Sequence, residues 1–197
     1  MATADSLEEL LSDIRQCRLC EAHLPLGPRP VLRAGVGARL LIVGQAPGTK
    51  VHASGIPWDD PSGERLRHWL SIDTQTFYDR DRVAIIPMGF CYPGRLPKGG
   101  DRPPRPECAP TWHPSLLTHL PRIELTVLAG AYGQKRFLGG KRGKTLTETV
   151  RAWRDHAPHI MPLPHPSWRT VGWQKRNPWF DEEVLPELRR RVRDLVG

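Results

Sequence analysis

Residues 40–66 read "LLIVGQAPGTKVHASGIPWDDPSGERL". The stretch opens with an apolar run, 40–43, which is typical of a strand buried on both faces of a parallel sheet. Gly44, Pro47 and Gly48 end this run and open a loop of polar and aromatic residues. Ligands of open α/β sheets bind beyond the carboxyl ends of the strands. The stretch therefore predicts an α/β fold with a binding site in this loop.

Three further apolar runs read as buried strands, at 82–87, 125–130 and 159–164. Between the four runs, apolar residues recur at helical spacing, as in Leu66, Trp69 and Leu70; Leu116, Leu117 and Leu120; and Leu146, Val150 and Trp153. Strands that alternate with helices predict a four-stranded parallel sheet in an α/β sandwich. We find no internal repeat and no linker, so we expect a single domain over 1–197.

Both ends of the chain carry helical patterns. Ser6 followed by Glu9 forms a capping-box pattern, and the apolar residues Leu7, Leu10, Leu11 and Ile14 then share one face. This helix is expected to end near Cys17. At the other end, 181–196 places apolar residues on one helical face and arginines on the other.

The chain is basic. It has 29 Lys and Arg against 21 Asp and Glu, a formal charge of +8, which favours a polyanionic partner such as nucleic acid. An Arg-rich genome would give the same composition without any such partner. The sequence shows no signal peptide and no membrane-spanning run. We expect a cytoplasmic monomer that does not enter membranes, whose thiols stay reduced.

The cysteines form two pairs. Cys17 and Cys20 make a CxxC, and Cys91 and Cys108 bracket the Pro- and Gly-rich stretch 88–110. Four thiolates in this layout predict a metal centre that holds the stretch closed. Spacing alone fits zinc and an iron-sulfur cluster equally well.

Two more motifs follow predicted strands, "GQAPG" at 44–48 and "HPSWR" at 165–169. Together with "CRLC" (17–20), "DRPPRPEC" (101–108), "VLAG" (127–130) and "LPHPS" (163–167), they resemble the uracil-DNA glycosylase superfamily, most closely the family 4 enzymes of bacteria and archaea. The resemblance implies a three-layer sandwich and a 4Fe-4S cluster held by the four cysteines. It also implies a DNA glycosylase of base excision repair, acting on uracil, hypoxanthine or xanthine at the bacterial nucleoid.

The resemblance also assigns roles to residues. Gly44, Gln45, Ala46, Pro47 and Gly48 would line the base pocket, and Trp58 would stack on a base flipped out of the helix. His165 would donate a hydrogen bond to the departing base. Ser167 and Arg169 would contact backbone phosphate, and Trp168 would wedge into the DNA.

The chain departs from family 4 at two positions. Gln45 stands where those enzymes have Glu, so the carboxylate that stabilises the sugar cation must come from elsewhere. Family 5 enzymes carry an Asp shortly before an "SG", a spacing that favours Asp60 over Asp59, although capping of a helix would explain the same pair. Pro87 stands where family 4 has an Asn that reads uracil.

Two other functions remain open at this point. Gln45 and Pro87 favour an inert superfamily member that binds DNA or a nucleotide without cleavage. The second alternative function is that of a redox-responsive protein in which the cluster is the sensor. The basic run 133–144 suits phosphate contact or an exposed loop equally well.

Overall fold

The computed structural model describes residues 6–197. Four parallel strands form one sheet in the order β2-β1-β3-β4. Their bounds are β1 (Leu40–Val43), β2 (Val83–Ile85), β3 (Leu125–Ala129) and β4 (Ile160–Leu163). The four predicted strands and the α/β sandwich are confirmed.

Helices cover both faces of this sheet. They are α1 (Leu7–Arg15), α2 (Thr49–Ser54), α3 (Pro61–Leu70), α4 (Thr74–Tyr78), α5 (Cys108–Thr118), α6 (Ala131–Leu138), α7 (Leu146–Arg151), α8 (Thr170–Arg176) and α9 (Leu185–Val196). A π-helical turn, Phe180–Val184, leads into α9. The sequence patterns predicted α1, α3, α5, α7 and α9 but not α2, α4, α6 and α8. The basic run 133–144 begins inside α6.

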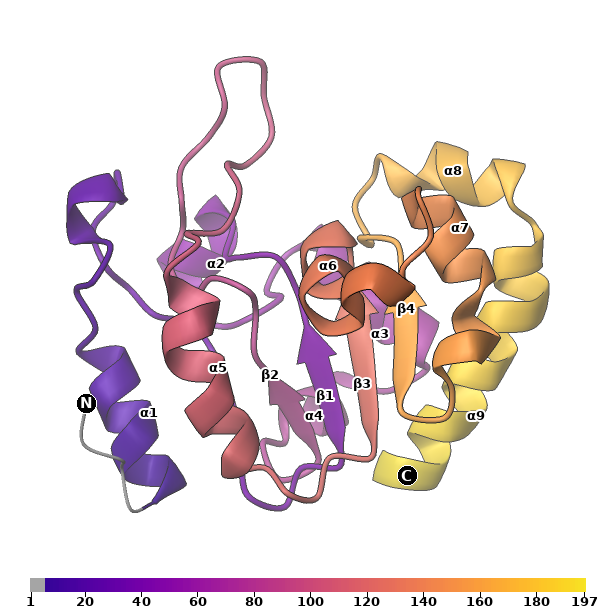
Figure 1. Ribbon diagram of the computed structural model, residues 1–197, viewed down its shortest axis with the longest axis horizontal. Helices are drawn as coiled ribbons and strands as arrows, with labels where there is room; N and C mark the ends of the chain where they lie inside the picture. Colours follow the sequence, from indigo (N-terminus) through magenta and orange to yellow (C-terminus); the bar gives the residue numbers. More distant parts are fainter. Residues whose placement is uncertain (1–5) are drawn as a thin grey trace.

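The three layers follow from alternation along the strands, because successive side chains point to opposite faces of a sheet. Leu40 and Ile42 belong to one core with residues of α3, α7 and α9. Leu41 and Val43 belong to a second core with residues of α1, α5 and α6. Figure 1 shows α1 and α5 on one side of the strands and α7 and α9 on the other. No helix within residues 6–197 combines the length and the apolar character needed to cross a bilayer.

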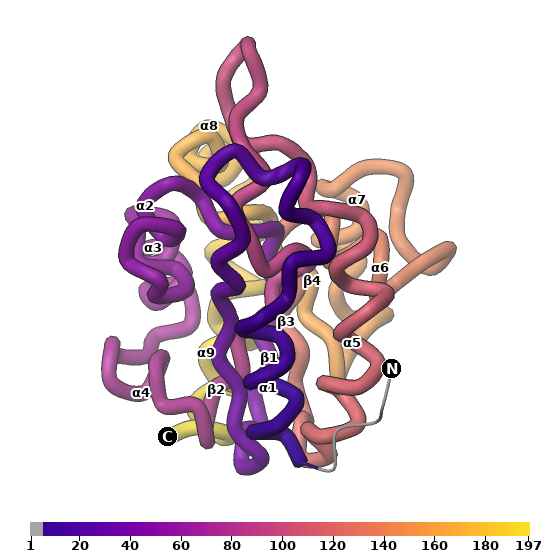
Figure 2. Tube along the Cα trace, turned by 90° about the vertical axis from the view of Figure 1, so that its left-hand side faces the viewer, coloured from indigo at the N-terminus to yellow at the C-terminus, as the bar shows by residue number. Residues whose placement is uncertain are grey.

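The strand order places a site at one end of the sheet. The chain runs outward from β1 to β2 and then returns to β3 on the other side of β1, so the loops beyond β1 and β3 diverge and leave a crevice there. The loop between β2 and α5, residues 86–107, projects from this end. Figures 1 and 2 both show it at the same end of the molecule as α2 and α8.

A buried histidine supports the start of this projecting loop. His113 of α5 is buried, and its Nε2 lies 3.0 Å from the carbonyl oxygen of Pro87. Its ring stacks on Phe90 with centroids 5.8 Å apart. Burial lowers the pKa of His113, the bond to Pro87 opposes this, and Arg136 adds to the lowering.

We expect the protein to lose stability below about pH 6.5. With its pKa lowered, His113 stays neutral in the folded state while the unfolded chain takes up a proton, so the free energy of unfolding falls as the pH falls through this value. Urea denaturation at about pH 7.5 and 5.5 measures the difference. The loss of stability between the two pH values should be smaller in His113→Gln than in the wild type. It should be unchanged in His68→Gln, because His68 is exposed. An unchanged difference in His113→Gln would contradict this account.

Candidate functional site

An open cleft of about 620 Å³ lies beyond the carboxyl ends of β1 and β4. Its walls come from the loop after β1, the start of α3, the projecting loop 86–107 and the segment after β4. The lining includes most of the residues predicted for the site: Gly44, Gln45, Ala46, Pro47, Gly48, Trp58, Asp60, His165, Ser167, Trp168 and Arg169. Segments far apart in sequence therefore meet in one place, as the sequence predicted.

Trp58 holds a constrained position in this cleft. Its backbone is left-handed, with φ of +58°, which is uncommon for a bulky residue. A Cβ added to Gly63 would lie 1.8 Å from the Trp58 carbonyl oxygen, and one added to Gly44 would lie 2.8 Å from its indole ring. The two glycines thus allow Trp58 to lie between the end of β1 and the start of α3.

The structure gives Asp60 and Asp59 different environments. Asp60 is the N-cap of α3 and its Oδ1 accepts a 2.8 Å hydrogen bond from Gly63 N–H. It is half-buried and lines the cleft. Asp59 is exposed and is not among the lining residues. The capping role considered for the pair therefore holds for Asp60, and it leaves the other carboxylate oxygen of Asp60 without a hydrogen bond from residues 6–197.

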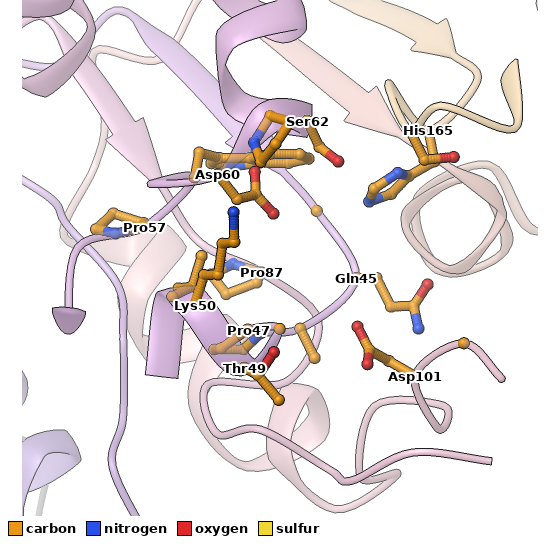
Figure 3. Close-up of a pocket in the computed structure, with 18 of the residues that line it drawn as sticks. Gln45, Pro47, Thr49, Lys50, Pro57, Asp60, Ser62, Pro87, Asp101 and His165 are labelled. Atoms are coloured by element: carbon orange, nitrogen blue, oxygen red, sulfur yellow. The ribbon is translucent and has the colours of Figure 1, made fainter. Parts of the chain in front are cut away.

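His165 stands across the cleft from Asp60 (Figure 3). Its ring centroid lies 5.5 Å from that of Trp58. Burial lowers the pKa of His165, and the negative charge of Asp60 opposes that lowering. The imidazole of His165 is therefore neutral, and one of its nitrogens can donate a hydrogen bond. The carboxylate of Asp60 lies close enough to act on it electrostatically.

Several hydrogen bonds fix the segment that carries His165. Its carbonyl oxygen accepts from Ser167 N–H at 2.8 Å and from the hydroxyl of Thr170. The buried Gln134 donates to the Leu163 carbonyl at 2.8 Å, and Arg65 of α3 donates to the Ser167 carbonyl at 3.2 Å. The imidazole is thus positioned by α3, α6 and α8 together.

Gln45 has a structural task. Its side-chain Nε2 donates a 3.2 Å hydrogen bond to the Arg102 carbonyl, and its main-chain carbonyl accepts one from Gly89 N–H at 3.0 Å. Both partners lie in the projecting loop. The N–H groups of Gln45 and Ala46 make no backbone hydrogen bond within the described chain, so they remain available to a ligand.

Trp168 and Arg169 stand at the mouth of the cleft. Trp168 is 76% exposed, which is unusual for so large an apolar side chain. The Arg169 guanidinium lies 5.4 Å from its ring centroid. The pair offers an apolar face beside a positive charge.

Sequence reasoning missed three charged residues of the cleft, Lys50, Arg95 and Asp101. Burial raises the pKa of the Asp101 carboxyl, Arg95 opposes this, and the charge of Asp60 adds to it. Figure 3 shows Asp101 beside Gln45 and Lys50 near Asp60. Asp101 begins the motif "DRPPRPEC", but nothing in that motif indicates a place in the cleft. Its position depends on the tether from Gln45 to Arg102, which no local pattern reveals.

The four cysteines come together at a second location. Cys17, Cys20, Cys91 and Cys108 line one small cavity with Phe90, Arg105 and Trp112 among its walls. All four are free thiols. Burial raises the pKa of Cys91 to about 11 and that of Cys108 to about 12. A bound metal would favour the thiolates and release their protons to solvent.

This donor set fits an iron-sulfur cluster, which is held by four cysteine thiolates. Within residues 6–197, no three His, Cys, Asp or Glu side chains converge on the position of a single metal ion. Both the cluster and its ligands stay predictions.

A family model described as the Uracil DNA glycosylase superfamily matches residues 33–189. The chain belongs to this superfamily. The match spans all four strands and every lining residue of the cleft except Val31. Cys17 and Cys20 precede the matched range, so the match does not bear on the metal centre.

We expect Gly63→Ala to destabilise the protein by about 1–3 kcal/mol, the cost of overpacking. The new methyl group would overlap the Trp58 carbonyl and push Trp58 and Asp60 out of place. Gly140→Ala is the matched control, because nothing lies near its Cβ position. Urea denaturation compares the two variants. Equal unfolding midpoints would show that the Trp58–Gly63 contact does not constrain the fold.

Proposed function

We propose that this protein is a DNA N-glycosylase related to family 4, which hydrolyses the N-glycosidic bond of a deaminated base during base excision repair. One observation carries the proposal: Asp60 and His165 face each other across a single cleft, and the charge of Asp60 acts on the pKa of His165. Breaking this bond needs a donor for the departing base and an anion for the sugar cation. The cleft supplies both.

The base would leave toward His165. As the bond between C1′ and the base nitrogen breaks, its electron pair moves onto the base, and a hydrogen bond from the neutral imidazole stabilises that negative charge. Gln45 and Ala46 line the same cleft, and their N–H groups make no backbone hydrogen bond within the described chain. These groups would add to the stabilisation of the departing base.

The sugar would lie over Asp60. The carboxylate stabilises the oxocarbenium ion that forms at C1′ and orients a water molecule toward it. When the water oxygen bonds to C1′, Asp60 accepts the released proton. The N-cap hydrogen bond from Gly63 N–H holds the carboxylate in place.

Trp58 would contact the extruded base. Its indole lines the cleft next to His165, and an aromatic face beside the leaving-group donor suits a stacked base. Ser167 and Arg169 at the mouth would contact the flanking backbone, consistent with the net positive charge of the chain. Trp168 beside them would wedge into the DNA where the extruded base leaves a gap.

The cysteines Cys17, Cys20, Cys91 and Cys108 would hold a 4Fe-4S cluster. Bound there, the cluster would close the loop 86–107, which carries Arg95 and Asp101 to the cleft, and so its role would be structural. The spacing of the four thiols around one cavity supports this assignment.

Single- and double-stranded oligonucleotides that carry uracil, hypoxanthine or xanthine test the proposal. Cleavage at abasic sites after alkali treatment, resolved on a denaturing gel, reports excision. We expect excision of at least one of the three bases. DNA binding without any excision would instead favour an inert binding protein.

We expect Asp60→Asn to lower the excision rate by about 100-fold or more while DNA affinity stays nearly unchanged. Asn is as good an N-cap as Asp, so this variant keeps α3 intact and removes only the charge. Asp59→Asn is the control, because Asp59 is exposed and lies outside the cleft. Full activity in Asp60→Asn would refute the assigned role.

We expect the purified protein to be brown and to contain about four irons and four sulfides per chain. Replacing any one of the four cysteines with Ala should bleach the absorbance near 400 nm and lower the melting temperature. Metal analysis of the wild type and of each variant checks this. A colourless protein with stoichiometric zinc would overturn the cluster assignment.

A further inference from the structure

The projecting loop ends in a short, stiff hairpin. Arg95 and Asp101 pair as an antiparallel bridge. Beyond them, Leu96 N–H donates to the Gly100 carbonyl at 2.9 Å, and Gly99 N–H donates to the Leu96 carbonyl at 2.9 Å. Gly99 and Gly100 have φ of +86° and +88°, the left-handed conformation that glycine adopts without strain.

The base of this hairpin is anchored. Arg102 N–H donates to the Gly94 carbonyl at 2.8 Å, and the Arg102 guanidinium donates to the Arg95 carbonyl at 3.3 Å. Gln45 ties the same stretch to the loop after β1 through the Arg102 carbonyl. The hairpin is therefore held as a rigid projection.

The tip of the hairpin carries an exposed apolar side chain. Leu96 is 45% exposed and lines the mouth of the cleft, as does Trp168. A Cβ on Gly100 would lie 3.2 Å from the Arg169 guanidinium, so the tip adjoins the segment that carries Trp168. Two exposed apolar residues from two different loops thus flank one opening.

Most of the charged side chains around Leu96 are positive, although Asp101 of the same hairpin is an acid. Arg95, Lys98 and Arg102 belong to the hairpin or its base, and Arg169 adjoins it. A rigid tip with an apolar side chain among cations fits DNA, because phosphates bind the cations while apolar side chains insert between base steps.

One extruded nucleotide leaves one gap in its own strand, and Trp168 stands on the side of the cleft that holds His165. Figures 1 and 2 show that the hairpin reaches farther from the body of the protein than α8 does. Its tip therefore lies farther out than α8, where the complementary strand of a bound duplex would pass.

Resting on the function proposed above, we propose that Leu96 is a second wedge, which inserts into the complementary strand opposite the extruded nucleotide. The substrate is then duplex DNA. A single strand offers Leu96 nothing to separate, so the wedge contributes only when both strands are present.

The test compares Leu96→Ala with wild type on matched single- and double-stranded substrates under single-turnover conditions. We expect excision from the duplex to fall about tenfold, since the variant lacks the apolar side chain that would help to unstack a base step. Excision from the single strand should stay within about twofold. Leu96→Met should retain the duplex rate because it keeps an apolar wedge of similar size.

Two control variants separate the wedge from other effects. Val36→Ala removes an exposed apolar side chain that precedes β1, at the other end of the sheet, and should change neither rate. Lys98→Ala should weaken binding to both substrates alike, since it removes a phosphate contact. Equal losses on both substrates in Leu96→Ala, or no loss on the duplex, would overturn the proposal.

A binding measurement distinguishes this inference from the proposed function. 2-Aminopurine placed in the complementary strand, opposite a uracil, fluoresces when it is unstacked. Wild-type protein should raise its fluorescence and Leu96→Ala should not, whether or not excision follows. A wild type that excises nothing but still raises the signal would refute the glycosylase function alone. Equal signals from both proteins would refute the wedge.

Discussion

The close approach of Trp58 to two glycines is the contact on which the rest of the site depends. Gly44 directly follows β1 and Gly63 lies in the first turn of α3. Each is so near to Trp58 that a side chain there would overlap it. This contact sets the distance between the central strand and α3. It also places the Trp58 ring against His165 and, two residues later, brings Asp60 to the start of the helix. The left-handed backbone of Trp58 costs free energy, which the packing of α3 against β1 and α9 offsets.

The projecting loop is the second element that the site requires, and it is tied to the sheet by side chains rather than by secondary structure. Gln45 bonds to its backbone from the loop after β1, and His113 supports its beginning from α5. The cysteines at its two ends meet the N-terminal pair around one cavity. The cysteine cavity and the cleft are therefore connected, because the same loop that carries Cys91 also carries Asp101 to the cleft. Loosening one end of this loop would move the other.

The sheet, its parallel order and the amphipathic helices could be predicted because each depends on local periodicity. The run at 40–43 is apolar throughout, the run at 125–129 is apolar apart from Thr126, and α9 has a clear apolar face. The short helices α2 and α8 escaped prediction because tertiary contacts, not periodicity, determine them. The cleft was found through motifs that sit where strands end. Asp101 and Leu96 were missed because their positions depend on a hydrogen bond between residues 57 apart in sequence, from Gln45 to Arg102.

The tether also explains why an amide and not a carboxylate stands at residue 45. Its Nε2 donates to the Arg102 carbonyl, and a carboxylate there would bring two acceptor oxygens together, which is unfavourable at hydrogen-bonding distance. An acid at this position would therefore release the hairpin from the cleft. Asp60 does not conflict with the tether, because its partner is the N–H of Gly63 at the start of α3, where the helix dipole favours negative charge. The chain thus uses the loop after β1 for architecture and keeps its negative charge at a helix start, facing the imidazole of His165.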